Sequence, residues 1–520
     1  MHMTTTVLVV ALLLVCSLAL AADYTLWTAP SVQKVFRADK PPDPPTPVHL
    51  TAAHNEFEAV QVVITAGDEA LKGVTVTARP AQNPPAPSAG SFVAPRIPVK
   101  LYLPHYVPCP NAGRDFPDPL PPLTGPFDVE ANTSQPVWVE AYIPPKVGPR
   151  ECRLFVSVKP ANAPKKDLSV NLTLRPFELP EAVEPVTTFG LSDGFILQQH
   201  GVEAGTPEAQ ALITKYYEVL LEHYVSAYSL PVELKSPEAA KYLNDPRLTS
   251  YVIPWKEDEA YLREIGTYLN QHGWLDKGYM YVVDEPINKD SYDRIKAVAE
   301  LIHRAYPKLR LTAPFFRAPD WDDKLTTFDV LTGSLDIWCP NEHYFDTNPR
   351  IYEQFRERQQ AGEAGWWYVC CGPGEPYNNF FVSMDGFAHR LIFTQMCRLG
   401  VTGLLYWSTT YWNPTTGTKD PWTDIATVKD INPLIYGDGS LLYPGKQVGI
   451  DGPVGSIRLK LIRDGIEDYQ YLRLLADRRG EEAAKRAARA LCPSLSEYCH
   501  DGGQLARIRD KIAEEIASDR

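Results

Sequence analysis

The chain has 520 residues, a formal net charge of −13 at pH 7 and a pI near 5.4. A chain of this length folds into two or three units with a sizeable core. Its negative charge argues against nucleic acid or an anionic membrane as a partner, because either would repel the protein. A neutral partner is therefore expected, and nothing in the sequence sets the oligomeric state.

The first 21 residues have the pattern of an export signal. Residues 7–20 are apolar, and Ala19-Leu20-Ala21 has the small-x-small form that a signal peptidase accepts. This apolar run is too short for a membrane span, and no later stretch is long and apolar enough to form one. We therefore expect a signal peptide at residues 1–21 and a secreted or periplasmic protein without an integral membrane span.

Eight of the nine cysteines follow the signal segment, and an exported protein can oxidise them. Cys492 lies close enough to Cys499 for a small stapled loop, and Cys109 is a possible partner of Cys152. No cysteine or histidine spacing matches a metal site, so no metal is expected.

Residues 22–180 have the pattern of an antiparallel β-sandwich. Short alternating segments, such as "EFEAVQVVITA" (56–66) and "DLSVNLTLRPF" (167–177), are separated by turn residues and many prolines. The proline-rich "RPFELPEAVEP" (175–185) then predicts a linker.

After the linker, short apolar strands alternate with helical segments, from "TTFGLS" (187–192) to "GLLYWST" (403–409). About eight strands with intervening helices favour a (β/α)8 TIM-like barrel over an open sheet. We place this barrel at residues 181–475 and a helical C-terminal tail at 476–520. The predicted protein is thus multi-domain, with a β-sandwich, a barrel and a short tail.

The most informative stretch is "KGYMYVVDEPIN" (277–288), where a buried strand ends on the adjacent carboxylates Asp284 and Glu285 before Pro286. Catalytic groups of a barrel gather at the carboxyl ends of its strands. The other predicted strand ends are rich in aromatic and polar residues, which suits a sugar site. The substrate-binding candidates are Trp338, Asn341, His343, Trp367, Tyr377, Trp407 and Trp412; the alternative is that the aromatic residues fill the barrel core and rim.

Adjacent carboxylates can divide the work of glycosidic cleavage, which needs a proton donor for the leaving oxygen. Repulsion raises one pKa, so Glu285 can remain protonated as the general acid while Asp284 stays ionised. Asp284 can then hold the N–H of a substrate acetamido group, whose carbonyl oxygen attacks the anomeric carbon. This chemistry needs no cofactor. A salt-bridged or solvent-facing acidic loop is the structural alternative.

Several stretches resemble glycoside hydrolase family 123 and the proteins that share its catalytic domain. They occur in order over roughly residues 50 to 475: "NEFEAVQVVI", "LRPFELP", "YVVDEP", "WWYVCCGPGEPYNNF", "GLLYWST", "GDGSLLYPG" and "SIRLKLIRDGIEDYQYL". The resemblance implies a sandwich followed by a barrel, and a retaining exo-β-N-acetylgalactosaminidase that uses substrate-assisted catalysis on an oligosaccharide or glycoconjugate. It also implies Asp284 as the acetamido-orienting residue and Glu285 as the acid/base.

Two other functions remain open. In the first, a retaining β-glycosidase uses Glu285 as acid/base and Glu375, at the end of the seventh predicted strand, as nucleophile. In the second, a carbohydrate-binding surface protein has no turnover.

Four charged residues in the last motif, Arg458, Arg463, Asp464 and Asp468, are interpreted as a structural ion-pair network, with substrate contacts as the alternative.

Overall fold

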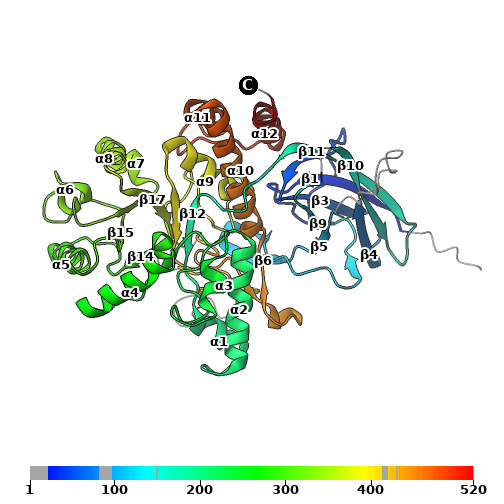
Figure 1. Cartoon of the computed structure of the whole chain (residues 1–520). Coiled ribbons are helices and arrows are strands. Elements are labelled where there is room, and N and C mark those ends of the chain that lie inside the picture. Colours follow the sequence, from blue (N-terminus) through cyan, green and yellow to red (C-terminus); the bar gives the residue numbers. More distant parts are fainter. Residues whose placement is uncertain are drawn as a thin grey trace, which may run out of the picture.

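The computed structural model describes residues 22–80, 97–147, 150–412, 420–428, 431–432 and 434–518. The predicted signal segment lies outside these ranges. A sheet-rich N-terminal region packs beside a barrel, and the C-terminal helices lie against both (Figure 1). None of the helices within the described ranges is both long and apolar enough to cross a membrane.

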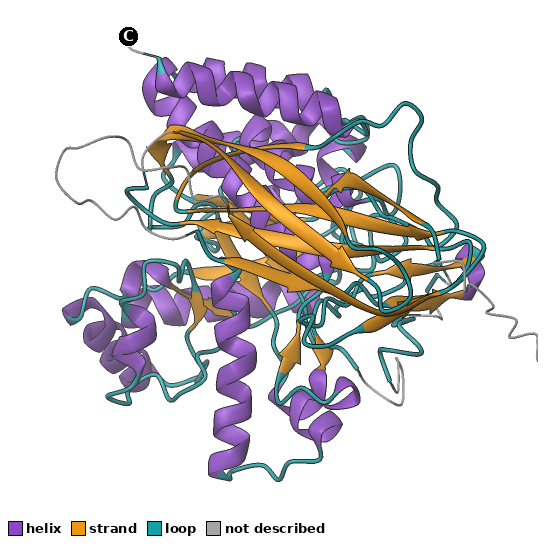
Figure 2. Cartoon of the chain, turned by 90° about the vertical axis from the view of Figure 1, so that its right-hand side faces the viewer, coloured by secondary structure: helices purple, strands orange, loops and turns teal. Residues whose placement is uncertain are grey.

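The N-terminal region consists of two facing sheets, seen broadside in Figure 2. One has the order β1-β3-β9-β5 and the other the order β2-β11-β10-β4-β8. Their strands are β1 (Tyr24–Pro30), β2 (His49–His54), β3 (Glu56–Ala66), β4 (Leu71–Pro80), β5 (Val99–Tyr102), β8 (Phe127–Val129), β9 (Ser134–Ile143), β10 (Arg150–Lys159) and β11 (Lys166–Glu178). A separate hairpin is formed by β6 (Tyr106–Cys109) and β7 (Arg114–Pro117), with the short helix η1 (Pro110–Ala112) between them.

Alternating apolar side chains build the core between the two sheets. Val60, Val62 and Ile64 of β3 pack in the same cluster as residues of β10 and β11. This is the pattern that period-two alternation predicts. One pairing differs from the antiparallel prediction, because β2 runs parallel to β11.

The second region is a nearly closed, seven-stranded parallel barrel with the order β12-β18-β17-β16-β15-β14-β13. Its strands are β12 (Val186–Phe189), β13 (Tyr251–Val252), β14 (Gly278–Tyr281), β15 (Leu311–Phe315), β16 (Ile337–Pro340), β17 (Ala364–Val369) and β18 (Gly403–Tyr406). The sequence predicts about eight strands, with one of them near residues 226–232. This segment forms only an isolated bridge between Ala227 and Phe189.

The backbone of residues 226–228 nevertheless crosses the gap between β12 and β13. Phe189 N–H donates to the Ser226 carbonyl at 2.9 Å, and Tyr228 N–H donates to the Phe189 carbonyl at 2.9 Å. On the other side, Val252 N–H donates to the Tyr228 carbonyl at 2.7 Å. The hydrogen-bonded ring therefore continues across the gap.

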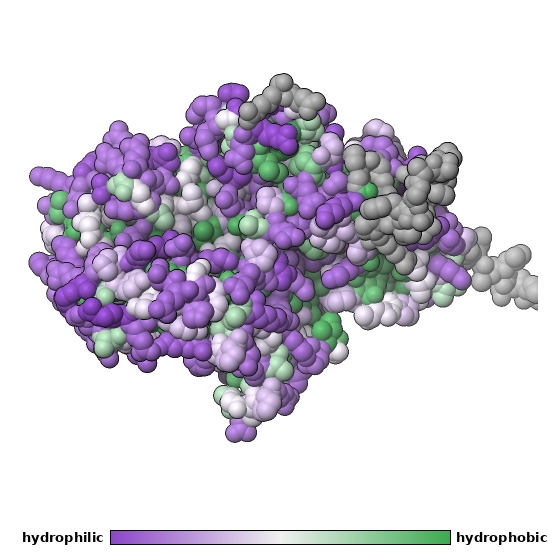
Figure 3. Space-filling model, in the orientation of Figure 1, coloured by the Kyte–Doolittle hydropathy of each residue, from purple (hydrophilic) through white to green (hydrophobic). Residues whose placement is uncertain are grey.

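Helices surround the barrel, and the face that they present in Figure 3 is mostly hydrophilic. They are α1 (Asp193–His200), α2 (Pro207–Glu222), α3 (Ala239–Leu243), α4 (Glu259–Gln271), α5 (Lys289–Ala305), α6 (Thr327–Leu331), α7 (Tyr344–Thr347), α8 (Pro349–Gln360) and α9 (Gly386–Leu399). Shorter elements are η2 (Leu275–Lys277), η3 (Gly445–Val448), β19 (Tyr443–Pro444) and β20 (Pro453–Val454). The chain ends with α10 (Ile457–Arg479), α11 (Glu481–Leu491) and α12 (Gly502–Ala517).

Helix α10 lies between the sandwich and the barrel, and the expected division at 475/476 falls inside it (Figure 1). Its buried charges pair with both sides: on the barrel side, Asp468 accepts from Arg390 of α9 at 2.6 Å, and within the helix Asp464 lies 3.3 Å from Arg463. Arg458 forms an ion pair with Asp118 at 2.8 Å, and both side chains are 0% exposed. Arg463 pairs with Glu140 of β9 at 2.8 Å. The interpretation of these α10 residues as a structural network is confirmed.

The cysteines of the described ranges form no disulfide. None of the eight cysteines after the signal segment, all of which lie in the described ranges, is part of a disulfide, including those of the two suggested pairs. Cys109 and Cys152 belong to different apolar clusters, so the first-domain pairing does not occur.

Candidate active site

Strand β14 brings Asp284 and Glu285 to the carboxyl end of the barrel. Tyr279 and Met280 are buried in the strand, which ends at Tyr281. Successive strand residues normally point to opposite faces. Glu285, however, has φ of +41°, a left-handed conformation that is rare for a residue with a side chain. This backbone turn breaks the alternation, and strain of this kind concentrates at functional sites.

Asp284 is exposed and accepts a hydrogen bond from the Tyr281 hydroxyl at 2.6 Å. No arginine or lysine of the described residues forms an ion pair with it. The carboxylate is therefore not a member of a structural salt bridge, and its remaining oxygen lone pairs can accept a hydrogen bond from a ligand.

Glu285 is half-buried, and its Oε1 accepts a hydrogen bond from the hydroxyl of Tyr368 on β17. Burial raises the pKa of Glu285, and the charge of Asp284 raises it further, whereas the Tyr368 hydrogen bond acts in the opposite direction. A carboxyl group of this kind can hold a proton under conditions where an ordinary glutamate has lost it.

The two tyrosines that donate to these carboxyl groups belong to one apolar cluster. Tyr281 and Tyr368 belong to one cluster inside the barrel, together with Tyr228 and Cys339. The Tyr228 hydroxyl is buried and has no hydrogen-bond partner in the described part of the chain. Burial raises the pKa of Tyr228, and the Asp284 charge contributes to the same shift. Asp284 and Glu285 thus meet the inner cluster through separate tyrosines.

Asn341 and His343 follow β16 and reach the same end of the barrel. The Asn341 side chain is 2% exposed, and its backbone forms a bridge with Tyr368, the partner of Glu285. His343 Nδ1 lies 2.6 Å from Asn341 Oδ1, and the His343 ring meets the Tyr377 ring edge-on at 6.2 Å. The structure therefore places Asn341, His343 and Tyr377 near the carboxyl end of β17, the strand that carries Tyr368, which donates to Glu285.

Trp407 follows β18 and is held by a carboxyl group that the sequence did not identify. Its Nε1 donates to Asp438 Oδ1 at 3.1 Å, and the Tyr406 hydroxyl donates to the same oxygen at 3.0 Å. Burial raises the pKa of Asp438 to about 6, although both hydrogen bonds oppose this. Gly190 allows two backbone segments to lie in close contact, because a Cβ at this position would lie 1.9 Å from the Trp407 carbonyl oxygen.

Cys371 links this side of the site to Glu285. Contact with the Cys370 thiol lowers the pKa of Cys371, and the nearby charges of Asp438 and Glu285 oppose this effect. Asp438 and Glu285 therefore both lie close enough for their charges to raise the pKa of the Cys371 thiol. Of the described residues, no three His, Cys, Asp or Glu side chains form a group that could hold a metal ion.

Three predicted substrate-binding residues lie in the core instead. Trp338, Trp367 and Trp412 are each 0% exposed. Trp338 stacks on Phe328 at 4.4 Å, and Trp412 Nε1 donates to the Ser440 hydroxyl at 3.1 Å. Because no ring face is accessible, these residues fill space around the barrel and cannot stack on a sugar in this structure.

Glu375, the alternative nucleophile, is exposed in the loop between β17 and α9. It has no hydrogen bond or ion pair with the described residues. The pKa of Glu285 is raised by burial and, in addition, by the charge of its neighbour Asp284.

A comparison with protein families matches residues 216–475, half of the chain, to the model of the glycoside hydrolase 123 catalytic domain. The chain belongs to glycoside hydrolase family 123. No curated protein matches it. This family 123 chain is similar to one solved structure with a TM-score of 0.66 and 12% sequence identity. The match covers 95% of this chain and 97% of the chain in that structure. That structure is a family 123 glycoside hydrolase from Clostridium perfringens, described in a study of glycolipid glycan hydrolysis.

Two further solved structures have weaker likeness to this family 123 chain. A GH5 xyloglucanase from Bacteroides ovatus gives a TM-score of 0.29 at 9% identity, covering 85% of this chain and 100% of the other. A β-D-glucuronidase from Dictyoglomus thermophilum gives 0.32 at 8% identity, covering 80% and 68%. The Clostridium perfringens structure therefore supports the fold.

The structure adds three tyrosines and one aspartate to the predicted site: Tyr228, Tyr281, Tyr368 and Asp438. Tyr281 could have been found from its place three residues before Asp284, on the strand that delivers it. Asp438 lies in "GDGSLLYPG", whose glycines favour a tight turn but do not show that its carboxyl group reaches Trp407.

Proposed function

We propose that this family 123 protein is a retaining exo-β-N-acetylgalactosaminidase that uses substrate-assisted catalysis. The observation that carries the proposal is the placement of Asp284 and Glu285 against two tyrosines of one inner cluster. Glu285 has a raised pKa, and Asp284 forms no ion pair with the described residues. An acid and a hydrogen-bond acceptor therefore stand side by side.

In the first step, Glu285 donates its proton to the leaving glycosidic oxygen as the bond to the anomeric carbon breaks. Asp284 accepts a hydrogen bond from the acetamido N–H, and the acetamido oxygen forms a bond to the anomeric carbon. The product of this step is a cyclic oxazolinium ion with its positive charge next to the Asp284 carboxylate.

In the second step, the Glu285 carboxylate takes a proton from water, whose oxygen attacks the anomeric carbon. The ring opens, the acetamido group is restored and Glu285 is protonated again. Two displacements at the same carbon give net retention.

Trp407 supplies the aromatic surface for the sugar in this proposal, because it is the predicted tryptophan that remains partly accessible. His343 and Tyr377 supply polar contacts, and the buried Asn341 holds the His343 ring in place. A glycolipid glycan is a candidate substrate, since the similar Clostridium perfringens enzyme is described in that context.

Residues 226–228 take the place of the second strand of a (β/α)8 barrel, with the sandwich at 22–180, the barrel at 181–475 and the tail at 476–520. Residues 1–21 direct export to the periplasm or the medium, where glycans are accessible.

The proton-donor role is tested with Glu285→Gln and two aryl N-acetyl-β-D-galactosaminides. The variant should lose most activity on a phenyl glycoside, whose leaving group needs protonation. It should retain much more activity on a dinitrophenyl glycoside, whose leaving group does not. Equal losses on both substrates would remove Glu285 from the acid role, and no turnover of either by the wild type would favour a binding protein.

A further inference from the structure

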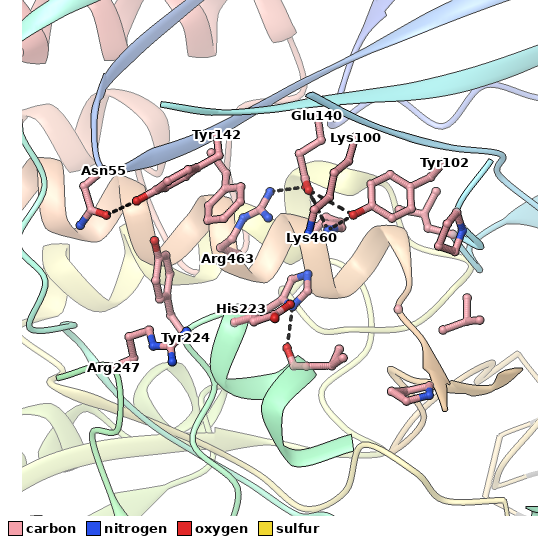
Figure 4. Close-up of a pocket in the computed structure, with 18 of the residues that line it drawn as sticks. Asn55, Lys100, Tyr102, Glu140, Tyr142, His223, Tyr224, Arg247, Lys460 and Arg463 are labelled. Atoms are coloured by element: carbon pink, nitrogen blue, oxygen red, sulfur yellow. Dashed lines mark hydrogen bonds and ion pairs between the residues drawn. The ribbon is translucent and has the colours of Figure 1, made fainter. Parts of the chain in front are cut away.

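A partly open pocket lies between the sandwich and the barrel, with a volume of about 630 Å³. Its walls come from β5 and β9 of the sandwich, the end of α2 and the first turns of α10 (Figure 4). His223 and Tyr224 precede residues 226–228, so this space is at the amino end of the barrel strands. Asp284 and Glu285 follow the carboxyl end, and the two sites are therefore separate.

His223 presents an unused hydrogen-bond acceptor in this space. The side chain is 5% exposed, and its Nδ1 lies 2.7 Å from the carbonyl oxygen of Val219. A carbonyl oxygen can only accept, so Nδ1 carries the proton and Nε2 of the neutral ring has the lone pair. Burial holds the pKa of His223 well below its usual value, with the charges of Lys460 and Arg463 acting in the same direction. Nε2 is buried and has no hydrogen-bond partner among the described residues.

Donors face this acceptor from α10. Lys460 and Arg463 both contact Glu140, at 3.0 and 2.8 Å, and each has donor capacity beyond that pair. The Arg463 Nε is buried, and none of the residues that the structure describes accepts a hydrogen bond from it. Tyr102 adds a hydroxyl group at 3.4 Å from Lys460 Nζ. An unsatisfied acceptor and an unsatisfied donor thus line one space, where each is unfavourable unless a ligand or water pairs with it.

Tyr224 places an aromatic ring in the same wall at the expense of backbone strain. Tyr224 is at the position after the C-cap of α2 and has φ of +62°. Glycine is the usual residue at this position when the backbone is left-handed. The Tyr224 N–H donates to the Leu221 carbonyl at 3.1 Å, and the next residue, Val225, donates to the Leu220 carbonyl at 3.0 Å, which completes the helix-ending motif. Tyr142 and Phe57 provide further aromatic surface, with ring centroids 4.7 Å apart.

The charge of the lining argues for a neutral ligand. Four basic residues, Lys100, Arg247, Lys460 and Arg463, are matched by four acidic residues, Glu140, Glu181, Glu222 and Asp245. A bound ion would leave this set unbalanced. The volume is in the range of small-molecule sites, about 300–1,000 Å³. A hydroxyl-rich ring compound matches the mixture of donors, acceptor and aromatic faces.

We propose that the space between the sandwich and the barrel is a second, non-catalytic binding site for a neutral saccharide, which donates a hydroxyl hydrogen bond to His223 Nε2. Arg463 and Lys460 donate to other hydroxyl oxygens, and Tyr224 packs against the ring. The site holds a glycan on the face opposite the catalytic residues and does not depend on which sugar is hydrolysed.

The test is hydrogen–deuterium exchange of the full mature chain, with D-galactose and N-acetyl-D-galactosamine as probes. At least one probe should protect a peptide that contains residues 219–225, and it should do so equally in Glu285→Gln, which is altered only at the catalytic end. Protection confined to the segment 403–412, or absent from the whole chain, would overturn the proposal. Activity is not the readout, so failure here is distinct from failure of the catalytic proposal.

Two variants locate the ligand. His223→Asn retains an amide donor near the Val219 carbonyl and removes Nε2, so the probe should bind about tenfold more weakly, as for the loss of one hydrogen bond. Tyr224→Gly removes the ring and relieves the left-handed strain, so the chain should fold while losing the protection. Unchanged affinity and unchanged protection of 219–225 in both folded variants would overturn the proposal.

Discussion

The buried carboxyl group of Asp438 should make the protein less stable as pH rises, and Asp438→Asn should remove this effect. Asp438 is 0% exposed, and burial raises its pKa from 3.8 to about 6. Between these values the folded protein keeps a proton that the unfolded chain has released. The wild type therefore loses stability as pH rises through this window, in contrast to a carboxylate whose pKa is lowered by folding.

The size of the effect follows from the pKa difference. At about 1.4 kcal/mol per pKa unit, the change amounts to about 3 kcal/mol over the full window, of which about 2 kcal/mol lies between pH 4.5 and 7.5. Asparagine does not titrate, and its carbonyl oxygen can still accept from Tyr406 and Trp407. Relative to the wild type, Asp438→Asn should therefore gain about 2 kcal/mol between those two pH values.

The assay is urea denaturation of both proteins from pH 4.5 to 7.5, with the free energy of unfolding compared at each pH. Asp128→Asn is the control, because the hydrogen bond from Lys72 lowers the pKa of this exposed carboxylate and its contribution weakens as pH falls. The compared quantity is the free energy of unfolding of Asp438→Asn minus that of the wild type. A value that stays constant or falls as pH rises would refute the reasoning.

Three further predictions concern the site and its support. Tyr368→Phe removes the hydrogen bond that lowers the pKa of Glu285, so the alkaline limb of the pH profile of kcat/KM should move to higher pH; an unchanged or lower limb would contradict this. Glu375→Ala should retain near-normal turnover without acceleration by azide, whereas an inactive variant rescued by azide would make Glu375 the nucleophile. Asp118→Asn leaves the Arg458 charge buried without its partner and should lower the free energy of unfolding by about 3–5 kcal/mol in urea titrations; a loss below about 1 kcal/mol would contradict a buried pair.

Local patterns predicted the parts of the fold that depend on one segment at a time. Period-two alternation identified strands such as β3 and β11, and the apolar run before Asp284 placed β14. Residues 226–232 failed as a full strand because only three residues reach the ring, where the chain turns sharply at Tyr224. The parallel pairing of β2 with β11 depends on a long-range connection that no local pattern encodes.

The site was predicted where function depends on strand ends and was missed where it depends on side-chain direction. Asp284 and Glu285 follow from the end of a buried strand. Trp338 and Trp367 were assigned to the sugar because they lie near the ends of neighbouring strands. Their side chains point outward from the barrel and belong to the core instead. Asp438 is 31 residues from Trp407 and meets it only through the folded loop.

The most direct test of the account is the selectivity of Asp284→Asn between two aryl β-galactosides that differ only in a 2-acetamido or a 2-hydroxyl group. If Asp284 grips the acetamido N–H, the wild type should strongly prefer the acetamido substrate. The variant should lose about 10²–10³-fold in kcat on that substrate, as for removal of one preorganised group that stabilises the transition state. The variant should show no comparable loss on the 2-hydroxyl substrate. An equal loss on both substrates, or an undiminished preference for the acetamido sugar, would contradict the division of roles between Asp284 and Glu285.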